Sequence, residues 1–197
     1  GGRGARKGEL VFHRSQRLLL RPIWPEDWQA LFSGIADEGV VRNLARAPWP
    51  YREEDARAFA GMAGDPLAPR FLITRAADAE AVGCIGFGPV GEASGGAAKD
   101  SEPFELGYWI ARAHWGQGYA TEAGAAVLEI AATLGHRELA ASHFLDNPAS
   151  GRVLRKLGFE PTGRVEPRWS CGRGAEAQAV QYRRLLGEDG ATSQRAA

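Results

Sequence analysis

Trp115-Gly116-Gln117-Gly118-Tyr119-Ala120-Thr121-Glu122-Ala123 is the stretch that decides the fold, together with the segments on either side of it. It follows Phe104-Glu105-Leu106-Gly107-Tyr108-Trp109-Ile110, which has the pattern of a strand, and it leads into residues 120–134, whose apolar side chains recur at helical spacing. A glycine turn between a strand and a helix presents backbone N–H groups at the positive end of the helix dipole. The sequence therefore predicts a binding site for an anionic, nucleotide-bearing ligand, with an unliganded tight turn as the alternative.

The composition is that of one soluble globular domain. The chain has 197 residues, of which 44% are hydrophobic and 24% charged, enough for a full-sized core. Basic and acidic residues balance at 24 each, so no net field favours nucleic acid or an anionic membrane as a partner. Cys84 and Cys171 lack the spacing of a zinc site, and we expect no metal. Residues 1–8 lack the apolar core of a signal peptide, and we expect a cytoplasmic protein.

The other elements follow from hydrophobic spacing and from the positions of proline and glycine. Helices are expected to begin at Pro25 and near Glu53, and a further helix is expected at 148–157. Strands are expected at 17–22, 70–74, 81–87, 138–145, 160–169 and 177–186. This pattern predicts a single α/β (α+β) domain over residues 17–186, with a twisted, mostly antiparallel sheet flanked by helices. Residues 1–16 and 187–197 are expected to be flexible segments outside the domain, and 88–103 a flexible loop within it.

Several motifs together narrow the ligand. The glycine turn lacks the GxxxxGK[ST] of a P-loop and the GxGxxG pattern of a dinucleotide fold. It resembles instead the acetyl-CoA pyrophosphate loop of the GNAT N-acetyltransferases, in the form found in the RimJ/RimL branch, which acetylates protein N-termini. Three further segments resemble that branch in the same order along the chain, besides the strand before the turn: Leu20-Arg21-Pro22, Gly83-Cys84-Ile85-Gly86 and Asn147 to Phe159.

The resemblance implies acetyl-CoA as the co-substrate and a set of residues that bind it. The turn would offer its backbone N–H groups to the pyrophosphate, and the end of the preceding strand would lie along the pantetheine arm. Asn147 would contact the pantetheine, although an N-cap of the helix that begins at Pro148 is an equally good explanation. Trp115 stands where most of the family has Gln or Arg, so a side-chain contact to the pyrophosphate is lost. The expected cofactor-binding residues are Trp109, Ile110, Ala111, Gly116, Gln117, Gly118, Tyr119, Ala120, Thr121, Asn147 and Ser150.

Acetyl transfer to an amine needs a base, a donor for the thioester oxygen and stabilisation of the leaving thiol. Glu105, at the start of the central strand, is the candidate base, with a salt-bridged strand carboxylate as the alternative. Backbone N–H groups near Ile110 are candidates for the oxygen contact. The tyrosine that acts as the acid in many GNATs is replaced here by Leu154, and the branch suggests Ser150 in its place. A serine in a first helical turn is more often a capping group.

The acceptor is expected to be a primary amine that attacks acetyl-CoA directly in a ternary complex. The branch points to a protein or peptide N-terminal α-amine, with Trp49, Tyr51 and Glu105 lining its site, although core packing explains the two aromatic residues equally well. Alternatives are a small-molecule acceptor such as an aminoglycoside, a polyamine or an amino acid, or a non-catalytic acyl-CoA-binding module. The sequence leaves the oligomeric state open between a monomer and a homodimer.

Overall fold

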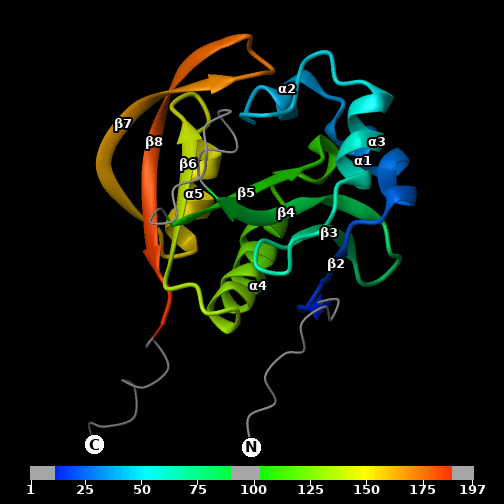
Figure 1. The fold of residues 1–197 in the computed structure, drawn as a ribbon, viewed down its shortest axis with the longest axis horizontal. Coiled ribbons are helices and arrows are strands. Elements are labelled where there is room, and N and C mark those ends of the chain that lie inside the picture. Colours follow the sequence, from blue (N-terminus) through cyan, green and yellow to red (C-terminus); the bar gives the residue numbers. More distant parts are fainter. Residues whose placement is uncertain (1–11, 90–102, 188–197) are drawn as a thin grey trace, which may run out of the picture.

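The computed structural model describes residues 12–89 and 103–187, which form an eight-stranded sheet with helices on both faces (Figure 1). The strands are β1 (His13–Arg14), β2 (Leu18–Pro22), β3 (Arg70–Arg75), β4 (Ala81–Pro89), β5 (Phe104–Ile110), β6 (Glu138–Phe144), β7 (Glu160–Ser170) and β8 (Ala175–Leu185). The helices are α1 (Trp28–Ile35), α2 (Glu38–Val41), α3 (Glu53–Gly61), α4 (Tyr119–Thr133) and α5 (Pro148–Lys156), with short 3-10 turns at Pro25–Asp27 and Arg112–His114.

The sheet is antiparallel except at its centre. Its strand order is β1-β2-β3-β4-β5-β6-β8-β7, and each neighbouring pair is antiparallel apart from β5 and β6, which run parallel. The predicted mixed fold with a mostly antiparallel sheet is thus confirmed. The parallel pair requires a crossover connection, and α4 provides it.

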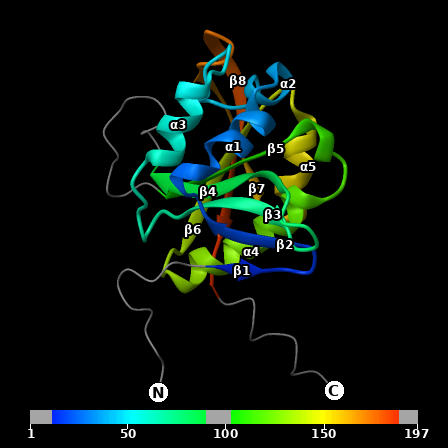
Figure 2. The ribbon, with the colours of Figure 1, turned by 90° about the vertical axis from the view of Figure 1, so that its right-hand side faces the viewer.

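The helices divide the apolar side chains of the sheet between two layers. On one face α4 packs on β2 to β5 through residues such as Val127 and Ala131, in a cluster that includes Leu20 and Ile85. On the other face α1 and α3 cover Leu72 and neighbouring side chains of β4 and β5. Figure 2 shows α1 and α3 on one side of these strands and α4 on the other. Within 12–89 and 103–187, no helix is long and apolar enough to cross a membrane.

Two expected boundaries are wrong, and α2 was not expected. His13 and Arg14 pair with Leu20 and Leu19, so the sheet reaches into the segment expected to lie outside the domain. A strand of two residues carries no hydrophobic alternation that sequence reasoning could detect. Gly88 and Pro89, which were expected to begin the loop over 88–103, belong to β4 and pair with β5. The rest of that loop, residues 90–102, and the termini 1–11 and 188–197 lie outside the described residues.

We expect Gly83→Ala to destabilise the protein at the β4–β5 pair. A Cβ at Gly83 would stand 2.2 Å from the carbonyl oxygen of Trp109 and 3.1 Å from Cα of Ile110, so the backbone of β5 would have to shift. Overpacking of this kind costs about 1–3 kcal/mol. Gly107→Ala on β5 is the matched control, because a Cβ there meets no atom within 4 Å. Urea denaturation measures both, and equal free energies of unfolding would contradict the expected clash.

Candidate active site

The central feature of the site is the divergence of β5 from β6. Only Phe104 with Leu139 and Glu105 with Ala140 pair between these strands, so the strands separate immediately after Glu105. The divergence is visible in Figure 1, where β5 and β6 point in different directions from a common origin. A cleft of about 1110 Å³ opens there, and its walls include the last residues of both strands and the N-terminal turns of α4 and α5.

The glycine turn forms one end of this cleft and has free donors. Gly116 and Gly118 have positive φ angles of 73° and 78°, and Gly118 is the N-cap of α4. Among the described residues, none of the six backbone N–H groups from Gly116 to Thr121 donates to a protein acceptor; the first bond of the helix is from the N–H of Glu122 to the carbonyl of Gly118. Unpaired N–H groups at a helix N-terminus fit a pyrophosphate.

Two further sets of contacts hold the glycine turn in place. The indole N–H of Trp115 donates to the carbonyl of Ile110 at 2.7 Å, which folds the turn back on β5. Arg17 donates to the carbonyl of Gln117 at 3.0 Å and to the Glu122 carboxylate at 2.7 Å. Trp115, where the family usually has Gln or Arg, thus has a structural role of its own.

Two of the expected cofactor residues have their backbone groups turned elsewhere. The N–H of Ala111 donates to the carbonyl of Val82 at 2.8 Å, and the carbonyl of Gln117 accepts from Arg17. Neither residue lines the cleft, whereas Trp109, Ile110 and the other expected residues of the turn do. The cofactor contacts themselves stay predictions.

Glu105 lies where the strands part, and it is bound to Arg168 of β7. The guanidinium donates to both carboxylate oxygens, at 2.8 Å for Nη2 to Oε2, and the Ser142 hydroxyl donates to Oε1 at 3.0 Å. Both charged side chains are largely buried, at 15% and 21% exposure. Burial acts to lower the pKa of Arg168, but the hydrogen bonds and the charge of Glu105 outweigh it and raise that pKa.

The ion pair corresponds to the alternative considered for Glu105, and the catalytic role stays a prediction. A carboxylate has about four lone-pair positions, and three of them on Glu105 accept bonds from Arg168 and Ser142. One acceptor position is left for an amine or a water. Sequence reasoning missed Arg168, because nothing local in the β7 sequence indicates a partner 63 positions away.

The first turn of α5 brings three polar side chains together. The side chain of Asn147 accepts from the N–H of Ser150 at 3.4 Å, so the expected N-cap is present. The Ser150 hydroxyl lies 2.6 Å from the hydroxyl of Tyr108 on β5. Leu154, one turn further along α5, is 1% exposed and belongs to the core. The pantetheine contact of Asn147 stays a prediction.

The family model described as an acetyltransferase (GNAT) domain matches residues 17–160. The chain belongs to the GNAT acetyltransferase family. It is 30% identical over 153 residues to the uncharacterized N-acetyltransferase YoaA of Bacillus subtilis, a match that covers 76% of this chain and 82% of that protein.

Solved structures of GNAT enzymes share the fold. A RimL ribosomal L7/L12 α-N-protein acetyltransferase in complex with coenzyme A superposes with a TM-score of 0.70 at 22% identity, covering 90% of this chain and 98% of that one. A spermidine N-acetyltransferase from Vibrio cholerae in complex with CoA and spermine gives a TM-score of 0.70 at 16% identity, covering 87% and 97%. At these identities the comparisons show the fold, while the family match shows that this chain is a GNAT N-acetyltransferase.

The two residues predicted to form an acceptor wall differ in their positions. Tyr51 is 9% exposed, packs with Ile35 and Val41 and lines the cleft. Burial, and then the charge of Asp55, raises the pKa of Tyr51 to about 12, so its phenol is neutral. Trp49 is 40% exposed and is not among the residues lining the cleft. Tyr51 therefore packs in the core and also lines the cleft, while its contact with an acceptor stays a prediction.

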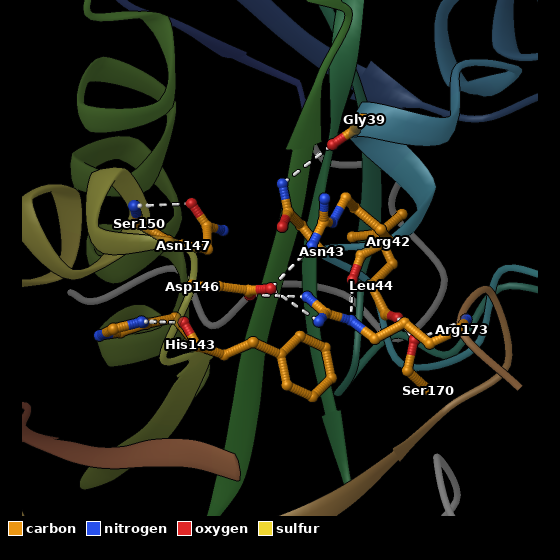
Figure 3. A network of polar contacts seen from close by, with 11 residues as sticks. Gly39, Arg42, Asn43, Leu44, His143, Asp146, Asn147, Ser150, Ser170 and Arg173 are labelled. Carbon is orange, nitrogen blue, oxygen red and sulfur yellow. Dashed lines mark hydrogen bonds and ion pairs between the residues drawn. The ribbon is translucent and has the colours of Figure 1, made fainter. Parts of the chain in front are cut away.

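A polar network joins the segment after α2 to the turn after β6 and to the β7–β8 turn (Figure 3). Asp146, between β6 and α5, accepts two bonds from Arg173 at 2.7 and 2.8 Å and one from Arg42 at 2.8 Å. In the same region the Ser170 hydroxyl donates to the carbonyl of Leu44 at 3.0 Å. The β7–β8 turn is therefore fastened to the segment after α2, a long-range contact that the sequence does not indicate.

Two other titratable groups of the cleft, His143 and Cys84, are already engaged in hydrogen bonds. The two ring nitrogens of His143 lie 2.8 Å from the carbonyl oxygen of Phe144 and 3.2 Å from the Tyr182 hydroxyl. The thiol of Cys84 donates to the carbonyl of Phe71, and burial raises its pKa to about 12. Within the described parts of the chain, no group of three or more His, Cys, Asp or Glu side chains could hold a metal ion.

We expect Asp146→Asn to make the protein less sensitive to acid. The hydrogen bonds from Arg173 foremost, against a smaller opposing effect of burial, lower the pKa of Asp146 to about 2. A depressed pKa stabilises the fold above the unfolded value near 3.8, and this stabilisation is lost as the pH falls toward 2. Because the side chain is 44% exposed, solvent screening limits the effect to about 1 kcal/mol.

Thermal denaturation between pH 7 and about pH 2 measures this contribution. The difference in Tm between parent and Asp146→Asn should shrink through that acid window and should also shrink in high salt. Glu166→Gln on β7 serves as a control for loss of an exposed carboxylate outside the network. A Tm difference that does not depend on pH would contradict the ion-pair explanation.

Proposed function

We propose that this GNAT enzyme transfers the acetyl group of acetyl-CoA to a primary amine, by direct attack in a ternary complex. The observation that supports this most is the set of backbone N–H groups from Gly116 to Thr121 that find no acceptor in the described part of the chain, at the end of a cleft formed by diverging strands. Acetyl-CoA supplies the activated acyl group. The protein binds its pyrophosphate by backbone N–H groups alone, because Trp115 is bonded to Ile110.

The residues between the glycine turn and Glu105 have the remaining tasks. Trp109 and Ile110 line the cleft along the free edge of β5, where a pantetheine arm adds like an extra strand. Backbone N–H groups near Ile110 stabilise charge on the thioester oxygen. Glu105 uses its remaining acceptor position to receive the amine and, in our proposal, its proton. Ser150 stabilises the leaving sulfur.

We propose a protein or peptide N-terminal α-amine as the acceptor. The RimJ/RimL-like motifs support it, and so do the charges of the cleft. Among the described residues the cleft contains three carboxylates, and each already accepts a hydrogen bond within the chain: Asp55, Asp65 and Glu105. Arg46 and Arg70 also face this space. A polycation such as a polyamine or an aminoglycoside needs surplus carboxylates, which this cleft does not provide.

Each of the two alternative functions, a small-molecule acceptor and a non-catalytic module, is supported by one observation. An amino acid or another small amine would fit the same cleft, since the neighbouring folds include an enzyme of a small polyamine. A non-catalytic acyl-CoA-binding module is suggested by Leu154, which fills the place of the usual acid. Thiol release from acetyl-CoA, measured with peptides of differing N-terminus, free amino acids, spermidine and an aminoglycoside, separates the three. Thiol release with peptides supports our proposal. If none of the amines causes thiol release, the non-catalytic module is favoured.

Gly118→Val should weaken acetyl-CoA binding by at least about 100-fold. The β-branched side chain strains a backbone with a φ of 78° and stands in the turn that must approach the pyrophosphate. Gly163→Val is the control, because its φ of 83° imposes the same strain in an exposed part of β7. Isothermal calorimetry with acetyl-CoA measures both. Parent-like affinity in Gly118→Val would show that the turn does not bind the cofactor.

Glu105→Gln should lower kcat by about 100-fold and change acetyl-CoA affinity little. The amide retains the shape of the side chain but can neither take a proton nor pair fully with Arg168. The measurement is the pH dependence of kcat with the best peptide acceptor, beside the Kd for acetyl-CoA. If the variant keeps the parent's pH profile, Glu105 is not the base and the ion pair is structural.

A further inference from the structure

Tyr108 brings a half-buried hydroxyl to the cleft at the point where β5 has left β6. Tyr108 pairs with Ile85 of β4, and its ring packs against the main core. The hydroxyl oxygen lies 2.6 Å from Oγ of Ser150. Both residues line the cleft. A residue of the strand and a residue of helix α5 thus meet across the opening between β5 and β6.

Either of the two hydroxyls could donate in this hydrogen bond, and their chemistry favours the phenol. Burial raises the pKa of Tyr108, against a smaller lowering effect of the bond to Ser150, so the phenol keeps its hydrogen at neutral pH. Within residues 12–89 and 103–187, Ser150 is the sole hydrogen-bond partner of that hydroxyl. A phenol is more acidic than an aliphatic hydroxyl and is the stronger donor, so we take Tyr108 as the donor and Ser150 as the acceptor.

Ser150 is then left with a hydrogen that points away from Tyr108. Its backbone N–H is already bonded to the side chain of Asn147, and its hydroxyl makes no other bond among the described residues. An oxygen that accepts from Tyr108 presents its own O–H in another direction, and the cleft is the open direction beside it.

We propose that Tyr108 is a positioning residue that directs the Ser150 hydroxyl as a donor toward the sulfur of acetyl-CoA. The inference rests on the proposed acetyl transfer. As the C–S bond breaks, its electron pair stays on sulfur, and the Ser150 O–H stabilises that charge by a hydrogen bond. The amine gives up one proton, through Glu105 to water, and sulfur takes one proton from water. The products are the amide and the free thiol, and Ser150 and Tyr108 keep their own hydrogens.

Tyr108 and Ser150 together take the place of the tyrosine that acts as the acid in many GNATs and that α5 lacks. Leu154 lies one turn beyond Ser150 and also lines the cleft, but a leucine has no hydroxyl to offer there. The strand supplies the phenol instead. A lone serine hydroxyl rotates freely between three staggered positions, and the bond from Tyr108 selects the one that leaves its hydrogen available.

The experiment uses CoA itself as the probe, besides turnover. Ultraviolet absorbance of the bound thiolate against pH gives the pKa of the CoA thiol in complexes with parent, Tyr108→Phe, Ser150→Ala and the double variant. We expect the parent to lower this pKa below that of free CoA, and each single variant to raise it. The double variant should give no further rise, because Tyr108 acts through Ser150.

Steady-state kinetics give a second measure. Tyr108→Phe should lower kcat about tenfold, the value of one hydrogen bond of about 1.4 kcal/mol, and change KM for acetyl-CoA less than about twofold. Tyr182→Phe is the matched control, since it also removes a buried phenol bond, to His143 at 3.2 Å. It should leave the CoA thiol pKa unchanged.

The outcomes separate the inference from the proposed function. If the parent binds CoA and transfers acetyl groups, but Tyr108→Phe matches Tyr182→Phe in thiol pKa and kcat, the inference fails and the function stands. Effects of Tyr108→Phe and Ser150→Ala that add would also overturn it. If the parent binds neither CoA nor acetyl-CoA, the proposed function itself fails. Circular dichroism of each variant confirms that it is folded.

Discussion

Strands β5 and β6 run parallel but share only two paired positions, and the active site depends on that short pairing. Beyond Glu105 the facing edges of the two strands are free of each other, so a ligand can bond to the edge of β5 as a further strand. Both strands also end on the same side, and each leads into a helix N-terminus, that of α4 and that of α5. One departure from regular sheet structure thus creates both the cleft and its donors.

An ion pair holds the apex of this divergence. Glu105 of β5 binds Arg168 of β7 and Ser142 of β6, so three strands meet in one set of hydrogen bonds at the point of separation. Removal of one partner from a buried pair leaves an uncompensated charge and typically costs about 3–5 kcal/mol. The carboxylate therefore serves the architecture whatever its part in the chemistry.

The sequence predicted the elements close to the motifs, because those depend on local patterns. The glycine turn, the helix 119–133 and the cap Asn147 follow from spacing, glycine conformations and capping preferences, which act within a few residues. The partners of Glu105 and Asp146 could not be predicted, since Arg168 and Arg173 reach them only when the β7–β8 hairpin folds across the sheet. The sequence also left the bond between Tyr108 and Ser150 unseen, 42 positions apart.

The two halves of the cleft are built from different kinds of interaction, and this bears on specificity. The end with the glycine turn presents backbone N–H groups, which suit the charge and shape of a phosphate and depend little on side chains, apart from the Trp115 bond that closes the turn. The segment after α2, part of which lines the cleft, is held by side chains instead: Arg173 and Arg42 bind Asp146, and the Ser170 hydroxyl donates to the carbonyl of Leu44. Substitutions there can reshape this wall of the cleft without disturbing the glycine turn. In the function that we propose, one co-substrate site can therefore serve different acceptors, which is why the family resemblance indicates acetyl-CoA more firmly than it indicates the amine.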